Sequence, residues 1–114
     1  MVLSITICTY NRLEYLKKCL NSILDQTKSN PEIEINIIDN NSTDKTKEYI
    51  YTMQKSFPEL NYYVEKKQGI SFARNLSFEV CKGEYLAFVD DDAVINKNWL
   101  ISLLNELKNK REQF

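Results

Sequence analysis

Residues 84–92 read EYLAFVDDD, an apolar run that ends in three consecutive aspartates. After Glu84 the run has no polar interruption, which is typical of a strand buried on both faces of a parallel sheet. Like charges at the end of such a strand repel one another unless a cation lies among them. The pattern therefore predicts a strand over 84–89 and a cation site at Asp90, Asp91 and Asp92. A solvated loop or helix cap remains the alternative.

Apolar residues alternate in three further segments of the chain and recur at helical spacing between these segments. We expect Pro58 to end the second helix, Gly83 to end the third as a C-terminal glycine, and Asn96 to cap the fourth. The predicted strands lie near residues 3–7, 33–38, 60–64 and 84–89, and the apolar faces of the predicted helices span 13–24, 49–57, 70–80 and 99–107.

This alternation predicts an α/β fold of the Rossmann type. Strands that alternate with helices form a parallel sheet with right-handed crossovers, so we expect about four strands with helices on both faces. The chain has 114 residues, and its sequence has no linker or internal repeat. We therefore expect residues 1–114 to form one domain.

Composition excludes several classes of function. The net charge is −1, which argues against a nucleic-acid partner, because nucleic-acid binding needs a basic face. The sequence has no histidine and three widely spaced cysteines, which excludes the usual zinc sites and histidine-dependent triads. No apolar run reaches the ~20 residues of a membrane span, so we expect a cytoplasmic protein, or a cytoplasmic part of something larger at a membrane surface.

The densest polar clusters all follow predicted strands. They lie at residues 9–12, 39–44 and 90–92, with Glu65 after the third strand. The carboxyl ends of parallel strands meet at one edge of the sheet, where ligands of such folds bind. We therefore expect one polar rim that forms a binding site.

A nucleoside diphosphate suits a rim that combines carboxylates, amides and a cation. Asp39 and the backbone near Thr9 can meet the base and ribose, while a divalent metal on the aspartates neutralises the diphosphate. Only two glycines are present, so neither common phosphate loop is possible. Arg74 is then the expected phosphate partner; the alternative is that it braces the rim carboxylates as an ion pair.

Four motifs in this order resemble the N-terminal half of inverting family 2 glycosyltransferases, which have the GT-A fold. The resemblance covers about residues 3–104, and its motifs are residues 9–12, 38–44, 69–75 and 89–92 with Trp99 and Leu100. The family transfers a sugar from a nucleotide-diphospho-sugar, usually a UDP-sugar, to an acceptor hydroxyl with the help of Mn²⁺ or Mg²⁺. The donor sugar and the glycan, lipid or other acceptor stay undetermined.

The resemblance also implies roles for individual residues. Asp92 would bind the metal, with Asp90 as a further ligand, and Asp90 or Asp91 would contact the ribose. The remaining donor-site residues would frame the nucleobase, approach the nucleotide or support these motifs; they are Thr9, Tyr10, Asn11, Arg12, Asp39, Asn41, Asp44 and Arg74.

The family places its catalytic base in the second half of the domain, beyond Phe114. We therefore expect a truncated, donor-binding half-domain that transfers sugar poorly or not at all. We also expect an open sheet edge beyond the fourth strand, which favours self-association. Two rivals are a receiver-type signalling domain, which lacks its acidic pair here because Thr9 and Tyr10 follow the first strand, and a nucleotide-binding or interaction module without chemistry.

Overall fold

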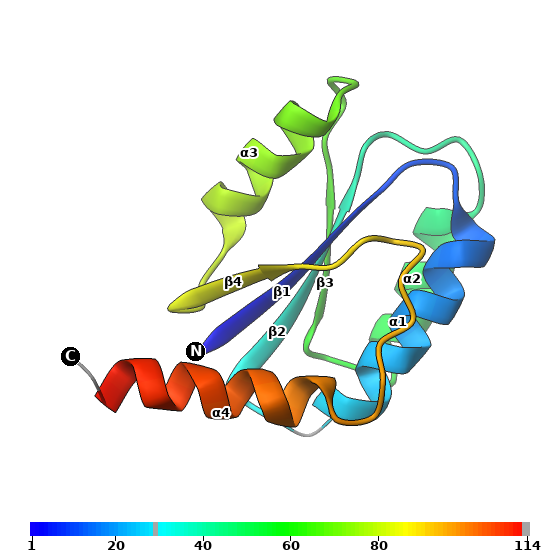
Figure 1. The fold of residues 1–114 in the computed structure, drawn as a ribbon. Coiled ribbons are helices and arrows are strands. Elements are labelled where there is room, and N and C mark those ends of the chain that lie inside the picture. The colour runs from blue at the N-terminus through cyan, green and yellow to red at the C-terminus, as the bar shows by residue number, and fades with distance from the viewer. Residues whose placement is uncertain (29, 113–114) are drawn as a thin grey trace.

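A four-stranded parallel sheet with strand order β3-β2-β1-β4 runs through the computed structural model, which describes residues 1–28 and 30–112 (Figure 1). Each strand is followed by a helix, as predicted. The elements in chain order are β1 (Leu3–Thr9), α1 (Leu13–Thr27), β2 (Ile33–Asp39), α2 (Thr46–Gln54), β3 (Leu60–Val64), α3 (Ile70–Val80), β4 (Tyr85–Phe88) and α4 (Trp99–Glu112).

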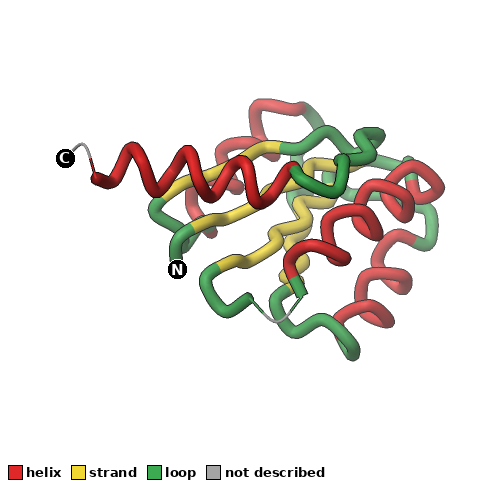
Figure 2. The backbone as a smooth tube through the Cα atoms, turned by 60° about the horizontal axis from the view of Figure 1, so that its bottom comes forward, coloured by secondary structure: helices red, strands yellow, loops and turns green. Residues whose placement is uncertain are grey.

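The helices cover both faces of the sheet, which confirms the predicted layers (Figures 1 and 2). One face is apolar because Leu3, Ile5 and Ile7 alternate with polar residues along β1, and it packs against α1, α2 and α4 in one core cluster. The opposite face packs against α3. Within the described ranges, no helix is both long enough and apolar enough to cross a membrane.

The polar face of the sheet is organised by the buried carboxylate of Glu34, which is 3% exposed. Its Oε2 accepts hydrogen bonds from Ser4 Oγ at 2.6 Å, Asn36 Nδ2 at 3.3 Å and the Lys82 backbone N–H at 2.8 Å. Its Oε1 accepts one from Asn61 Nδ2 at 3.2 Å. One side chain therefore joins β1, β2, β3 and the segment that leads into β4.

The strand pairing places the carboxyl ends of three strands level with one another. Thr9 pairs with Asp39, and Asp39 pairs with Val64. On the other side of β1, Thr6 pairs with Phe88, and the N–H of Val89 continues the ladder to the carbonyl of Thr6 at 3.0 Å. The loops that carry the predicted rim residues therefore start from the same edge of the sheet.

The prediction that the fourth strand is buried on both faces is wrong. β4 lies at the edge of the sheet, its residues are only partly buried, and Phe88 is 42% exposed. The apolar run does not need two covered faces, because Phe88 packs edge to face against Phe78 of α3 with ring centroids 5.9 Å apart. The expected open edge at the fourth strand is present among the described residues.

Three helix ends differ from the prediction. α2 ends at Gln54 and not at Pro58, because the chain already turns at residues 55–56. Gly83 does not terminate α3: the helix ends at Val80, and Cys81 after it is already extended. Asn96 does not directly precede α4; its Oδ1 accepts the N–H of Asn98 at 2.9 Å, and its carbonyl accepts the N–H of Trp99. Gly83 and Asn96 thus lie in the segments that lead into β4 and α4, and neither residue ends or starts a helix.

Gly83 is required for a different reason, namely the close approach of two backbones. A Cβ at this position would lie 2.6 Å from the Ser4 nitrogen and 2.8 Å from the Leu3 carbonyl carbon. Its N–H also donates to Ser4 Oγ at 2.9 Å, within the network around Glu34. Any side chain would push β1 away from the start of β4.

We predict that Gly83→Ala lowers the free energy of unfolding by about 1–3 kcal/mol, because backbone atoms must move to admit the methyl group. Urea denaturation followed by circular dichroism measures the change. Lys82→Ala, at the exposed neighbouring residue, is the matched control, and it should leave stability nearly unchanged. Equal stabilities for Gly83→Ala and the wild type would contradict the close approach.

Candidate functional site

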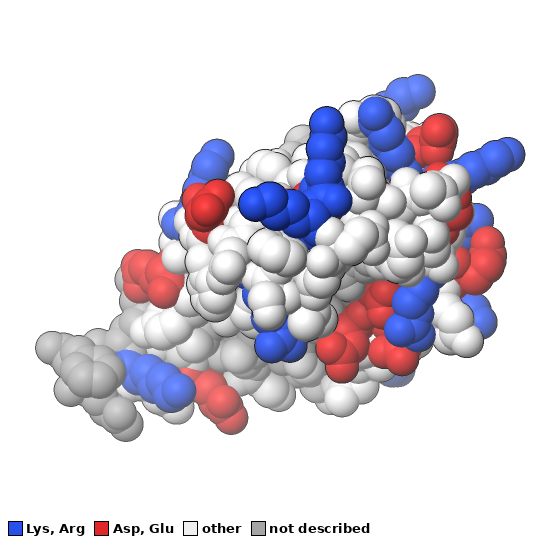
Figure 3. Space-filling view, turned by 90° about the horizontal axis from the view of Figure 1, so that it is seen from above, with Lys and Arg blue, Asp and Glu red and all other residues white. Residues whose placement is uncertain are grey.

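The loops at the carboxyl edge of the sheet surround a cavity of about 530 Å³. Seen from above, this edge carries a group of acidic side chains with basic side chains around it (Figure 3). Seven predicted site residues line the cavity: Thr9, Tyr10, Arg12, Arg74, Asp90, Asp91 and Asp92. The fold therefore brings together residues from β1, α3 and the end of β4.

Of the three aspartates, Asp91 is the one that is buried and fixed by a hydrogen bond within the protein. It is 7% exposed, and its Oδ2 accepts a hydrogen bond from Thr9 Oγ1 at 3.0 Å. Burial raises the pKa of the Asp91 carboxyl, the Thr9 hydrogen bond and the Arg12 charge lower it, and the neighbouring Asp92 and Asp90 raise it. The strand end thus keeps one carboxylate fixed against β1.

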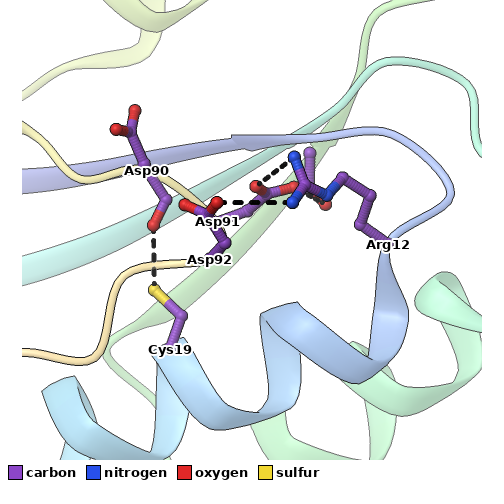
Figure 4. A network of polar contacts seen from close by, with 6 residues as sticks. Arg12, Cys19, Asp90, Asp91 and Asp92 are labelled. Atoms are coloured by element: carbon purple, nitrogen blue, oxygen red, sulfur yellow. Dashed lines mark hydrogen bonds and ion pairs between the residues drawn. The ribbon is translucent and has the colours of Figure 1, made fainter.

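The ion-pair partner of the aspartates is Arg12 and not Arg74 (Figure 4). Arg12 Nη1 lies 3.5 Å from Asp91 Oδ1, and Nη2 lies 3.4 Å from Asp92 Oδ2. Arg74 instead stacks over the ring of Phe88, with its guanidinium carbon 5.5 Å from the centroid. In the described part of the chain Arg74 has no ion pair, so the alternative that it braces the rim is wrong. Its guanidinium remains available at the cavity wall.

Asn11 fixes the loop from which Arg12 projects. It has a left-handed backbone with φ of 50°, a conformation that asparagine tolerates better than most residues. Its Oδ1 accepts the N–H groups of Thr43 at 2.7 Å and Asp44 at 3.2 Å, and its own N–H donates to Ser42 Oγ at 2.9 Å. Asn11 therefore joins the loops after β1 and β2 and does not line the cavity.

Asp39 is buried and does not line the cavity. The residue is 2% exposed, its Oδ1 accepts the N–H of Ser42 at 2.9 Å, and its Oδ2 accepts the hydroxyl of Tyr62. Burial and this hydrogen bond raise the pKa of Tyr62. Asn41, also predicted, is exposed with φ of 69° and lies outside the cavity lining.

Asn40 lines the cavity, although the sequence pattern did not predict it as a site residue. Its Nδ2 donates to the carbonyls of Glu65 at 3.0 Å and Lys67 at 2.7 Å, and its Oδ1 accepts the N–H of Gly69 at 2.9 Å. Asn40 thereby fixes the loop that leads into α3, the helix of Arg74. Nothing in the sequence separates this amide from an ordinary turn residue. The other lining residues not predicted are Cys8, Ile70, Ala73, Phe88 and Val89.

The residues fit a divalent cation only as a partial ligand set. Carboxylate oxygens are suitable ligands for Mn²⁺ or Mg²⁺, and the Asp92 side chain is 51% exposed. However, the Asp90 carboxylate is turned away from the other two (Figure 4). Within residues 1–28 and 30–112 no three acidic or cysteine side chains are grouped so that they could hold a metal. A cation here would take its remaining oxygen ligands from water or from a bound molecule.

Comparison with known proteins connects this geometry to a family. The model of the family Glycosyl transferase family 2 matches residues 4–114. Glycosyltransferase AglE of Haloferax volcanii is 36% identical over 85% of the chain, and glycosyltransferase GlyG of Streptococcus pneumoniae is 33% identical over 96%. The chain spans 32% and 36% of the lengths of these two relatives.

Solved structures agree with the sequence comparison. A crystal structure of S. aureus TarS superposes with a TM-score of 0.86 at 28% identity, covering 96% of this chain and 33% of that one. TarS has also been solved in complex with UDP and with UDP-GlcNAc. The match identifies the arrangement of strands and helices as that of GT-A glycosyltransferases.

Cys19 of α1 lies directly beneath the aspartates. Its Sγ donates to the carbonyl of Asp90 at 3.4 Å, and the residue is fully buried (Figure 4). Burial, and then the charges of Asp91, Asp92 and Asp90, raise the pKa of the Cys19 thiol to about 12. The thiolate is therefore strongly disfavoured in the folded state.

We predict that Cys19 reacts more slowly with a thiol reagent than either other cysteine at about pH 8, because the thiolate is the reactive form. Labelling variants that each retain one cysteine, with Cys8 or Cys81 as comparison, measures this order. Unfolding in urea should equalise the three rates. Rapid labelling of Cys19 in the folded protein would contradict this prediction, because it would show that the segment around Cys19 opens readily to solvent.

Proposed function

Because the chain belongs to glycosyl transferase family 2, we propose that the cavity binds the nucleoside diphosphate of a nucleotide-sugar donor, with UDP as the nucleotide. We also assign residues 1–114 to one donor-binding unit. The observation that carries the proposal is the convergence of Thr9, Arg74 and the aspartates on one cavity at the carboxyl edge of the sheet. The UDP and UDP-GlcNAc complexes of TarS support the choice of nucleotide.

The cavity has an apolar part suited to a base and a charged part suited to a diphosphate. Tyr10 is 44% exposed and Ile70 is 63% exposed, and together with Phe88 they offer apolar surface for stacking or packing. The carboxylates lie at the end of β4, where they can accept hydrogen bonds from ribose hydroxyls. We assign the ribose to Asp90 and Asp91 and the base to Thr9 and Tyr10. We assign Asp39 to the base as well, which it would reach only after its hydrogen bonds with Ser42 and Tyr62 open.

The diphosphate requires positive charge, for which we propose two sources, Arg74 and a divalent metal ion. Arg74 stands over Phe88 at the cavity wall, and we assign it to the diphosphate. Asp92 is the proposed protein ligand of Mn²⁺ or Mg²⁺, with Asp90 able to join it only after its carboxylate turns. When bound, such a metal stabilises the negative charge that develops on the leaving diphosphate.

The loop residues have a supporting role in this proposal. Asn11 and Asp44 hold the loops after β1 and β2 together, since Asp44 Oδ2 accepts the N–H of Leu13 at 3.4 Å and Asn11 binds the Asp44 backbone. The left-handed backbone of Asn41 allows the turn that follows Asp39. Preorganised loops lower the entropy lost on binding a ligand. Sugar transfer to an acceptor hydroxyl is the reaction we propose for the protein in which this donor site acts.

We predict that UDP binds with Mn²⁺ present, and that Asp92→Asn weakens this binding at least about tenfold, because it removes the charged metal ligand. Isothermal titration with and without Mn²⁺ measures both effects. Asp25→Asn is the matched control, since Asp25 is an exposed carboxylate on α1 away from the cavity lining. Absence of UDP binding under every condition would reject the donor site and leave an interaction module.

A second prediction separates ligand contact from structural support at Asp39. If Asp39 contacts the nucleoside, Asp39→Asn should weaken UDP binding by about tenfold through loss of a charged acceptor. Tyr62→Phe breaks the same internal hydrogen bond from the other side and leaves the carboxylate in place. UDP titrations together with urea denaturation of both variants make the comparison. Equal losses of affinity in the two variants would assign Asp39 to support of the loop alone.

A further inference from the structure

The guanidinium of Arg12 occupies the space between two carboxylates of the proposed donor site. Nη1 lies 3.5 Å from Asp91 Oδ1, and Nη2 lies 3.4 Å from Asp92 Oδ2 (Figure 4). We propose that Arg12 is a resident counter-ion that competes with a divalent metal for Asp92 and thereby sets the metal affinity of the site. This inference rests on the proposed function only in taking Asp92 as the metal ligand.

The aspartates need a counter-ion when no metal is bound. They are consecutive, and Asp91 is buried at 7% exposure, so their mutual repulsion is poorly screened by water. In the part of the chain that the structure describes, Arg12 is the one cationic side chain within ion-pair distance of them. Arg12 therefore supplies the positive charge that a metal would otherwise bring.

The contact with Asp92 is the one that can be released. Both distances are longer than the ~2.7–2.9 Å of a tight charge-assisted hydrogen bond. The Asp92 and Arg12 side chains are 51% and 43% exposed, and exposed ion pairs contribute little stability. The Asp91 partner is instead buried and held by Thr9. Because the two contacts use different nitrogens, Arg12 can release Asp92 and keep Asp91.

The base of the Arg12 side chain is fixed, so the exchange needs no movement of the loop. Asn11 joins this loop to the loop after β2, and the Arg12 carbonyl accepts the N–H of Leu16 at 2.9 Å at the start of α1. The guanidinium carbon also lies 4.7 Å from the ring centroid of Tyr15, a position that a cation favours. The guanidinium makes this contact with Tyr15 in the same position in which it pairs with the aspartates.

The test is titration of Mn²⁺ alone into the wild type and variants at low ionic strength, followed by electron paramagnetic resonance of free Mn²⁺. We expect Arg12→Gln to tighten Mn²⁺ binding by about tenfold, because a competing cation next to the ligand is removed. Lys17→Gln removes the same charge one turn further along α1 and should change binding less than about twofold. Adding Asp92→Asn to Arg12→Gln should abolish the gain.

Thermal unfolding gives an independent measurement. Without metal, Arg12→Gln should have a lower melting temperature than the wild type, and Mn²⁺ should raise the melting temperature of Arg12→Gln more than that of the wild type. If the glutamine variant does not fold, Arg12→Lys replaces it in both measurements. Lysine lacks the two-pronged guanidinium, so the Mn²⁺ affinity of the Arg12→Lys variant should be higher than that of the wild type.

Unchanged or weaker Mn²⁺ binding in both Arg12 variants, or an equal gain in Lys17→Gln, would overturn the inference. UDP titration in the presence of Mn²⁺ separates this failure from failure of the proposed function. If UDP binds through Asp92 while the Arg12 variants match the wild type, only the counter-ion role is rejected. If UDP does not bind but Arg12→Gln tightens Mn²⁺ binding, the donor site is rejected and the counter-ion role stands.

Discussion

The buried carboxylate of Glu34 is the constraint on which the arrangement of this sheet depends. A carboxylate withdrawn from water is costly unless every acceptor position finds a donor, and here hydroxyl, amide and backbone donors from all four strand regions supply them. A register shift of any strand would remove a donor and leave the charge poorly solvated. The pairing of Thr9 with Asp39 and of Asp39 with Val64 follows from this register, and so does the common edge from which the site loops depart.

The sequence was sufficient for the order and type of all eight elements, because strong alternation and helical spacing coincide with favourable turn residues. It was insufficient for the position of the fourth strand within the sheet. An apolar run is compatible with a central strand, but also with an edge strand whose aromatic residue packs against a helix, as Phe88 does against Phe78. Gly83 was similarly ambiguous, since a glycine after a helix suits both a cap and a close approach of two backbones.

At the site, residue types predicted which loops would meet but not which side chains would bind one another. Seven predicted residues line one cavity because strand ends in a parallel sheet are brought to one edge. The choice between Arg12 and Arg74 as partner of the aspartates depends on side-chain reach, which spacing along the chain does not encode. Asp39 was expected at the surface of the site, yet the hydroxyl of Tyr62, a residue on β3, keeps its carboxylate buried.

The side chain of Asn40 binds the loop after β3 through main-chain atoms of that loop, the carbonyls of Glu65 and Lys67 and the N–H of Gly69. The carbonyl of Asn40 also accepts a hydrogen bond from Gln68 Nε2 at 2.7 Å. Main-chain groups are present whatever residue occupies a position, so this clamp is indifferent to the identity of the exposed side chains of Lys66 and Lys67. Mutations there can alter charge and shape near the entrance to α3 while the helix keeps its place. The surface charge of this loop can therefore change without disturbing the scaffold beneath it.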